Sequence, residues 1–281
     1  MAEKKKTEVV IGFESHLLSS VDKMLPLMEK ADVILLENSP SNVREILNGK
    51  RPSFESGYSL PEFAQKQAPV LQRLHKKGKI VLGSEAAYDE SWMLKNKDIA
   101  RRMIKLELEQ KRLYLLGDIE GYARATLGIN KIREQERLKW IVERLPQYEG
   151  KTVYISAGEE HTALLHGLKK ILGKQGIPVR AEFLSRGYFK DKRTLVKYSP
   201  SVQLMRMLQF KTSLSSNRGA IKKLVKQDIR FEKNVNERIF KYMRQGASGE
   251  AAAEKAYLEI INSEKSKSIL KRIGSAFRRK R

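Results

Sequence analysis

The chain has 281 residues, no cysteine, and 56 Lys and Arg against 33 Asp and Glu, which gives a formal net charge of +23. The lack of cysteine excludes a disulfide-stabilised scaffold, a Cys-x-x-Cys zinc module and a cysteine nucleophile. At about 150 residues per domain, the length allows roughly two domains, the larger able to bury a core of its own.

The first residues show no targeting signal. MAEKKKTEVVIGF passes directly from charged residues to a strand-like run, without the long apolar region of a signal peptide. No stretch approaches the ~18 consecutive apolar residues that a membrane-spanning helix needs. We therefore expect a cytoplasmic protein without a transmembrane segment.

Short β-rich runs alternate with longer helical patterns over residues 8–190. The runs are VVIGF (9–13), VILLE (33–37), IVLGSE (80–85), TVYISAG (152–158) and PVRAEFL (178–184). This alternation is typical of an α/β domain in which helices flank a mainly parallel central sheet.

The connections between the runs predict helices and one long loop. Apolar residues at helical spacing predict a first helix near residues 17–28, with Pro26 as a kink. Further helices are predicted over 94–127, 130–145 and 163–172, the last ending at Gly173. Residues 38–63 are rich in Ser, Asn, Gly and Pro and predict a loop that serves as a lid or rim.

A second region, residues 196–281, is basic and α-helical in pattern. Residues 191–281 hold 23 Lys and Arg against 8 Asp and Glu. Lys222, Lys226, Arg230 and Lys233 share one side of a helical wheel, opposite an apolar side. Such a face attracts polyanions by neutralising phosphates and releasing counterions, so nucleic acid (RNA or DNA) or an acidic surface is the expected partner. Solubility or adaptation to high temperature is an equally good explanation of the charge.

Polar side chains follow four of the five predicted strands. Glu14 and His16 follow the first, Glu37 ends the second, Glu85 ends the third, and Glu160 and His161 follow the fourth. The carboxyl ends of parallel strands form the ligand-binding edge of an open sheet, so we expect these side chains to converge.

Two histidines with carboxylates suit a divalent ion such as Mn, Fe, Co, Ni or Zn, which activates bound water for hydrolysis. We expect His16, Glu37 and His161 as metal ligands, with Glu14 and Glu160 in catalytic roles. A buried structural histidine is the alternative for His161, because it shares a helical face with leucines.

Arg137 is the remaining catalytic candidate. In ERLKWIVERL it flanks an apolar stripe, so its guanidinium can reach the sheet edge and stabilise an oxyanion. A solvated surface arginine is the alternative, since Arg133 and Arg144 flank the same helix.

The motifs GFESH, DVILLENSP, ERLKWIVERL and VYISAGEEHTALLHGLKKIL occur in this order over about residues 8–185. Together they resemble the TraB/TIKI superfamily, which includes ChaN-like and erythromycin esterase-like proteins. The resemblance implies that His16, Glu37, Arg137 and His161 occupy the family's functional positions, and that Glu14 matches a carboxylate before the first histidine. Members include metal-dependent peptidases, esterases and haem-binding proteins, so the resemblance leaves the reaction open.

Two functions therefore remain open. The first is a metal-dependent hydrolase that cleaves an ester or amide bond in a small-molecule or peptide substrate, with the basic region recruiting an anionic partner. The alternative is a non-catalytic nucleic-acid-binding protein, in which residues 196–281 bind RNA or DNA and the α/β domain is a degenerate scaffold.

Overall fold

The computed structural model describes residues 6–14, 18–49, 61–116, 118–158 and 161–184. From the C-terminal region it describes residues 219, 226, 230, 233, 234, 237–247, 252, 255, 256 and 259. Three predicted site residues, His16, Glu160 and Lys222, lie outside these ranges.

A parallel sheet of five strands forms the centre of the domain, with the strand order β3-β2-β4-β1-β5. The strands are β1 (Glu8–Glu14), β2 (Val33–Leu36), β3 (Ile80–Gly83), β4 (Thr152–Gly158) and β5 (Val179–Phe183). They coincide with the five runs in the sequence, so the predicted α/β class with a parallel sheet is confirmed.

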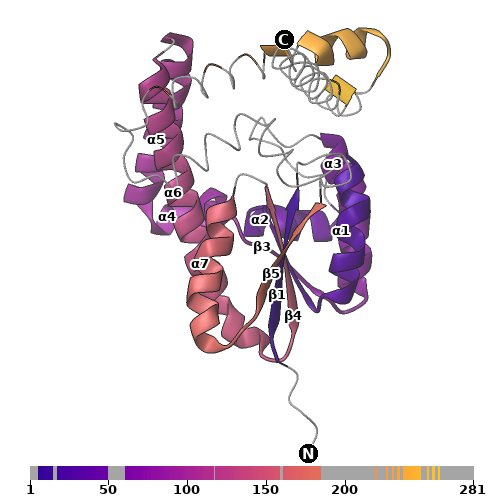
Figure 1. Cartoon of the computed structure of the whole chain (residues 1–281). Helices are drawn as coiled ribbons and strands as arrows, with labels where there is room; N and C mark the ends of the chain where they lie inside the picture. The colour runs from indigo at the N-terminus through magenta and orange to yellow at the C-terminus, as the bar shows by residue number, and fades with distance from the viewer. Residues whose placement is uncertain are drawn as a thin grey trace, which may run out of the picture.

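Helices cover both faces of the sheet (Figure 1). In chain order they are α1 (Leu18–Lys30), α2 (Pro40–Leu47), α3 (Pro61–Lys76), α4 (Glu90–Lys95), α5 (Lys97–Leu116), α6 (Ile119–Arg144) and α7 (Thr162–Leu172). Short 3-10 turns are η1 (Ala86–Tyr88), η2 (Leu145–Tyr148) and η3 (Gly173–Gln175). One core lies between the sheet and α1, α2 and α3, and a second lies between the sheet and α6 with α7.

The two faces follow from the direction of the connections. Those from β1 to β2 and from β2 to β3 run toward one edge of the sheet and carry α1 and α3 on one face. Those from β3 to β4 and from β4 to β5 run the opposite way and carry α6 and α7 on the other face, as right-handed crossovers require. β4 lies between β2 and β1. The helices that follow β1 and β2 cover one face of the sheet, whereas α7, which follows β4, covers the other. In open parallel sheets, the carboxyl end of such a strand is the usual place of a ligand site.

The helices between β3 and β4 differ from the prediction. The sequence predicts a helix end near residue 127, but α6 runs without a break from Ile119 to Arg144. The break lies earlier, because the Asp118 carboxylate caps α6 and accepts a hydrogen bond of 3.0 Å from the Gly121 N–H. Gly128 continues the helix and packs against Leu106 of α5.

The loop predicted over residues 38–63 contains helical structure. α2 begins at Pro40, and the Ser39 hydroxyl caps it by accepting a hydrogen bond of 3.2 Å from the Asn42 N–H. α3 then begins at Pro61. A serine cap followed by proline is a helix-start signal, so the prediction of a continuous loop is wrong for this part. Residues 50–60 lie outside the described chain.

α5 lies outside the two cores of the sheet and packs along α6 (Figure 1). A small separate core joins this pair to η1 through Ala87, Met103 and Ile132. Within the described ranges, no helix combines the length and the hydrophobicity that crossing a bilayer requires.

Candidate active site

The carboxyl ends of β1, β2, β3 and β4 place polar residues on one edge of the sheet. Glu14 ends β1 opposite Gly158, the last residue of β4. Glu37 follows β2 directly, and Ser84 and Glu85 follow β3. The sequence-based expectation that strand-end carboxylates converge is met for the residues that are described.

The chain after β2 stays paired with the chain after β3. The Ser84 N–H donates to the Leu36 carbonyl at 2.8 Å, and the Glu85 N–H donates to the Asn38 carbonyl at 3.0 Å. Gly83 is needed for this approach, since a Cβ there would lie 2.3 Å from the Ser39 carbonyl oxygen. The pairing holds Glu85 beside Glu37 at the edge.

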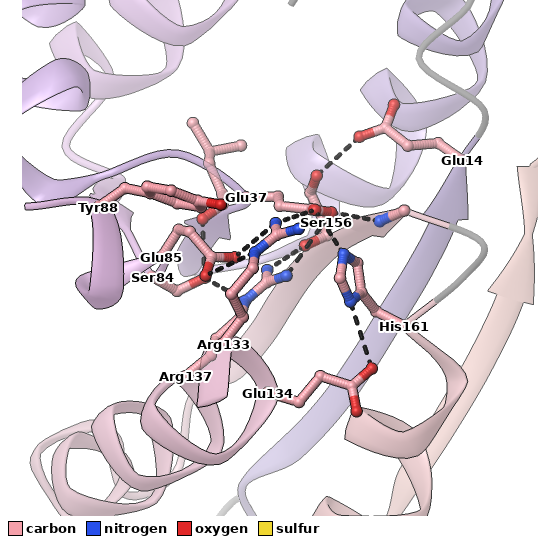
Figure 2. A network of polar contacts seen from close by, with 12 residues as sticks. Glu14, Glu37, Ser84, Glu85, Tyr88, Arg133, Glu134, Arg137, Ser156 and His161 are labelled. Carbon is pink, nitrogen blue, oxygen red and sulfur yellow. Dashed lines mark hydrogen bonds and ion pairs between the residues drawn. The ribbon is translucent and has the colours of Figure 1, made fainter. Parts of the chain in front are cut away.

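Glu37 is the centre of the site (Figure 2). Its Oε1 lies 2.9 Å from His161 Nε2 and 3.4 Å from Arg133 Nη2. Its Oε2 lies 3.6 Å from Arg137 Nη1 and accepts a hydrogen bond from the Gly158 N–H. One buried carboxylate thus contacts three cationic groups and one backbone amide.

His161 precedes the first turn of α7 and is buried between two carboxylates. Its Nε2 faces Glu37, and its Nδ1 lies 3.3 Å from Glu134 Oε1. Burial alone would lower the pKa of His161, but the Glu37 charge and the hydrogen bonds with Glu134 and Glu37 outweigh it and raise the pKa to about 10. The imidazole is therefore protonated at neutral pH, and its positive charge lies between the Glu37 and Glu134 carboxylates.

Arg137 is buried under the same edge, with 2% of its side chain exposed. Its Nε donates to Ser84 Oγ at 2.9 Å, and its Nη2 donates to the Ser156 carbonyl. The alternative of a solvated arginine is therefore wrong for this residue. The guanidinium group of Arg137 therefore connects the residue after β3, the backbone of β4 and Glu37.

Arg133 and Glu134 were missed by the sequence-based prediction. Arg133 has 16% of its side chain exposed, lies 3.4 Å from a Glu85 oxygen and stacks 5.2 Å from the centre of the Tyr88 ring. Asn130, Glu134, Arg137 and Ile141 follow the i, i+4, i+7, i+11 spacing of one helix face. Glu134 and Arg137 therefore share one face with the buried Ile141, and this spacing in the sequence could have identified Glu134 as a residue of the site.

Glu14 reaches the site through Ser156. Its Oε1 accepts a hydrogen bond of 2.7 Å from Ser156 Oγ, and the carboxylate is buried. The carbonyl of the same serine accepts from Arg137. One residue of β4 therefore joins Glu14 to the buried arginine.

Three carboxylates and three cations contact one another at this edge and form what we call the ion cluster. Its members are Glu37, Glu85, Glu134, Arg133, Arg137 and His161. The formal charges balance when His161 is protonated. Glu14 borders the cluster and adds a further carboxylate.

The described members do not fit a divalent metal. Both His161 nitrogens face carboxylates, and both Glu37 oxygens face positive or N–H groups. Two guanidinium groups next to Glu37 repel a cation. No set of three or more His, Asp or Glu residues is arranged as a metal site in the part of the chain that is described. The ligand set with His16 stays a prediction, because His16 lies outside that part.

Comparison of the chain with protein-family models, with curated proteins and with solved structures finds no match.

Proposed function

We propose that the protein is a hydrolase of ester or amide bonds, acting on a small-molecule or peptide substrate at the carboxyl end of β4. The observation that carries the proposal is that Glu14, Glu37, Arg137 and His161 come from four separate parts of the chain and meet in one connected network. A sheet edge with carboxylates, a histidine and arginines has the groups that hydrolysis of a carbonyl compound needs.

In this proposal Glu14 is the general base. Its Oε1 accepts a hydrogen bond of 2.7 Å from Ser156 Oγ, and the carbonyl of the same serine accepts from Arg137, which joins Glu14 to the ion cluster. Glu14 takes a proton from a water molecule while the oxygen of that water attacks the substrate carbonyl. Arg133, the more exposed arginine, stabilises the oxyanion that forms.

His161 holds Glu37 in place in this proposal. It lies between Glu37 and Glu134, and its two ring nitrogens face these carboxylates. As the tetrahedral intermediate breaks down, Glu14 gives the proton that it took from water to the leaving oxygen or nitrogen, the bond to the leaving group breaks, and the Glu14 carboxylate is regenerated. Arg137 holds Glu37, Ser84 and the Ser156 carbonyl in place, which makes it a positioning residue.

The test compares Glu14→Gln with Ser156→Ala on a panel of p-nitrophenyl esters and fluorogenic peptides. Ser156→Ala removes the hydrogen bond and keeps the base, whereas Glu14→Gln removes the base and keeps an oxygen that can accept the hydrogen bond. We expect Glu14→Gln to lose about 10²- to 10⁴-fold in turnover and Ser156→Ala to keep most of it. A wild-type protein that hydrolyses none of the substrates, or a Glu14→Gln variant as active as Ser156→Ala, contradicts the proposal.

Binding of RNA or DNA by the basic C-terminal region is the second candidate. Lys226, Arg230 and Lys233 are exposed, in agreement with a solvated basic face. Phe240 is 64% exposed, whereas Tyr242 is buried against Ala252. Phe240 is therefore the residue that we propose for base stacking.

A triple variant tests this candidate in the full chain. Replacing Lys226, Arg230 and Lys233 by Glu should weaken binding to a single-stranded RNA, because three phosphate contacts are lost. The slope of log K against log salt should fall by about 2. An unchanged slope excludes this face from binding.

A further inference from the structure

Exposed large apolar side chains are concentrated in one part of the domain. Among the described residues up to 184 they are Tyr88, Leu94, Ile104, Leu108 and Leu116. All five lie in η1, α4 and α5, and Leu94, Leu108 and Leu116 are more than 60% exposed at 62%, 63% and 67%. Such a concentration marks an interaction surface, whereas isolated exposed leucines do not.

The same surface is basic. At 3.6 residues per turn, six exposed residues of α5 lie within an arc of about 100°. These residues, which we call the α5 face, are Lys97, Arg101, Ile104, Lys105, Leu108 and Arg112. None of the three acids of α5 lies within the arc.

Ion pairs with those acids leave the face positive. Arg101 lies 3.7 Å from Asp98, and Arg112 lies 2.6 Å from Glu109. All four side chains are at least 41% exposed, and pairs of this kind contribute little in water. Contacts with an anionic partner can therefore replace these ion pairs at a small cost in free energy. Lys97 and Lys105 add further positive charge one turn away on either side of Arg101.

We propose that the α5 face binds an anionic membrane surface, with the helix lying parallel to the bilayer. Lys and Arg contact the lipid phosphates, while Ile104 and Leu108 enter the boundary between headgroups and acyl chains. The mixture of exposed apolar and basic side chains favours a membrane over other anionic partners and over a second copy of the chain. Nucleic acid satisfies the cations but offers the two apolar side chains no matching contact, and a second copy of the face would oppose like charges.

The position of α5 permits this contact. α5 packs on α6 and lies outside both cores of the sheet (Figure 1), and the six residues of the α5 face are exposed among the described residues. Binding through α5 would hold α6, the helix that carries Arg133 and Arg137, beside the membrane-bound helix.

The test is sedimentation of the full chain with vesicles of phosphatidylcholine alone or with about 30% phosphatidylserine. One variant removes charge through Lys97→Gln, Arg101→Gln and Lys105→Gln. A second removes apolar surface through Ile104→Gln and Leu108→Gln. The matched control, Lys169→Gln with Lys170→Gln and Lys174→Gln, removes three exposed lysines from α7 and η3 near the opposite edge of the sheet.

We expect the wild type and the control to bind the anionic vesicles equally. The charge variant lacks three charges and should bind about a hundredfold more weakly, at roughly fivefold per charge. The apolar variant should bind about tenfold more weakly, since two partly inserted side chains are lost.

Three results would overturn the proposal. The first is a wild type that does not sediment with anionic vesicles, and the second is a charge variant that binds like the control. The third is an apolar variant that binds like the wild type while the charge variant loses affinity for an RNA duplex measured in parallel. That result would assign the α5 face to nucleic acid.

Discussion

Replacing Glu37 by Gln removes one charge from the ion cluster and keeps the shape of the side chain. The carboxylate lies 2.9 Å from His161, 3.4 Å from Arg133 and 3.6 Å from Arg137, and only 9% of it is exposed. Removing one partner of a buried ion pair costs about 3–5 kcal/mol, because the remaining charge keeps its desolvation penalty. At about 2–4 °C per kcal/mol, the unfolding temperature should fall by about 6–20 °C.

The same substitution should lower the pKa of His161. Burial lowers this pKa, and Glu37 provides the largest opposing contribution, so without that charge the value must fall below about 10. Glu134 remains at Nδ1 and retains part of the shift. NMR titration of the ring resonances measures the pKa of His161 in the wild type and in Glu37→Gln.

The control is Glu143→Gln, an exposed carboxylate on α6, the helix that carries Arg133 and Arg137; it should change stability by less than about 0.5 kcal/mol. A double-mutant cycle of Glu37→Gln with His161→Gln should give a coupling energy of about 1–3 kcal/mol. A loss of stability in Glu37→Gln no larger than in the control, together with an unchanged pKa of His161, would refute the described cluster.

Three further predictions test other parts of the structure. The pKa of His161 is raised from 6.5 to about 10 on folding, so its contribution to stability is complete below pH 6.5 and is lost as the pH rises toward 10. Thermal unfolding of the wild type should show this decline, and an equal decline in His161→Gln would contradict it. Gly12→Ala should destabilise by about 1–3 kcal/mol, because its Cβ would lie 2.3 Å from the hydroxyl of buried Tyr154; Gly173→Ala, which meets no atom within 4 Å, is the control. A metal ion bound with a Kd of about 10 µM would raise the free energy of unfolding by about 2.7 kcal/mol at about 1 mM metal. We expect no such rise in unfolding temperature with Mn, Co, Ni or Zn, because both Glu37 oxygens face positive or N–H groups. An observed rise would support the predicted ligand set of His16, Glu37 and His161.

Residues at the ends of strands could be predicted because topology alone decides where they lie. Once the runs are recognised as parallel strands, Glu14, Glu37 and His161 must belong to one edge. The buried runs are continuous and apolar, which makes strands between two helix layers easy to recognise.

Residues on helices were harder to predict, because a helix can present any side to the sheet. Arg133, Glu134 and Arg137 lie within two turns of α6, and the sequence identified only Arg137. To identify all three, one must know which face of α6 packs on the sheet. Ile141 marks this face, but its burial becomes evident only in the structure. The start of α6 at Asp118 and of α2 at Pro40 rests on local capping, which the sequence does contain.

The ion cluster also bears on the choice between a catalytic domain and a degenerate scaffold. Burying charges is costly, and well-packed apolar residues in place of a buried ion pair are often neutral or stabilising by about 1–4 kcal/mol. The strands beneath the cluster already supply such a core, with Ile11, Leu35 and Ile155 fully buried. Stability alone therefore gives no reason to keep charged groups at the ends of β2 and β3 and on α6. A scaffold without chemistry would be free to lose them, whereas a site that stabilises changing charge needs fixed charges already in place. The cluster thus favours the catalytic hypothesis over the degenerate scaffold.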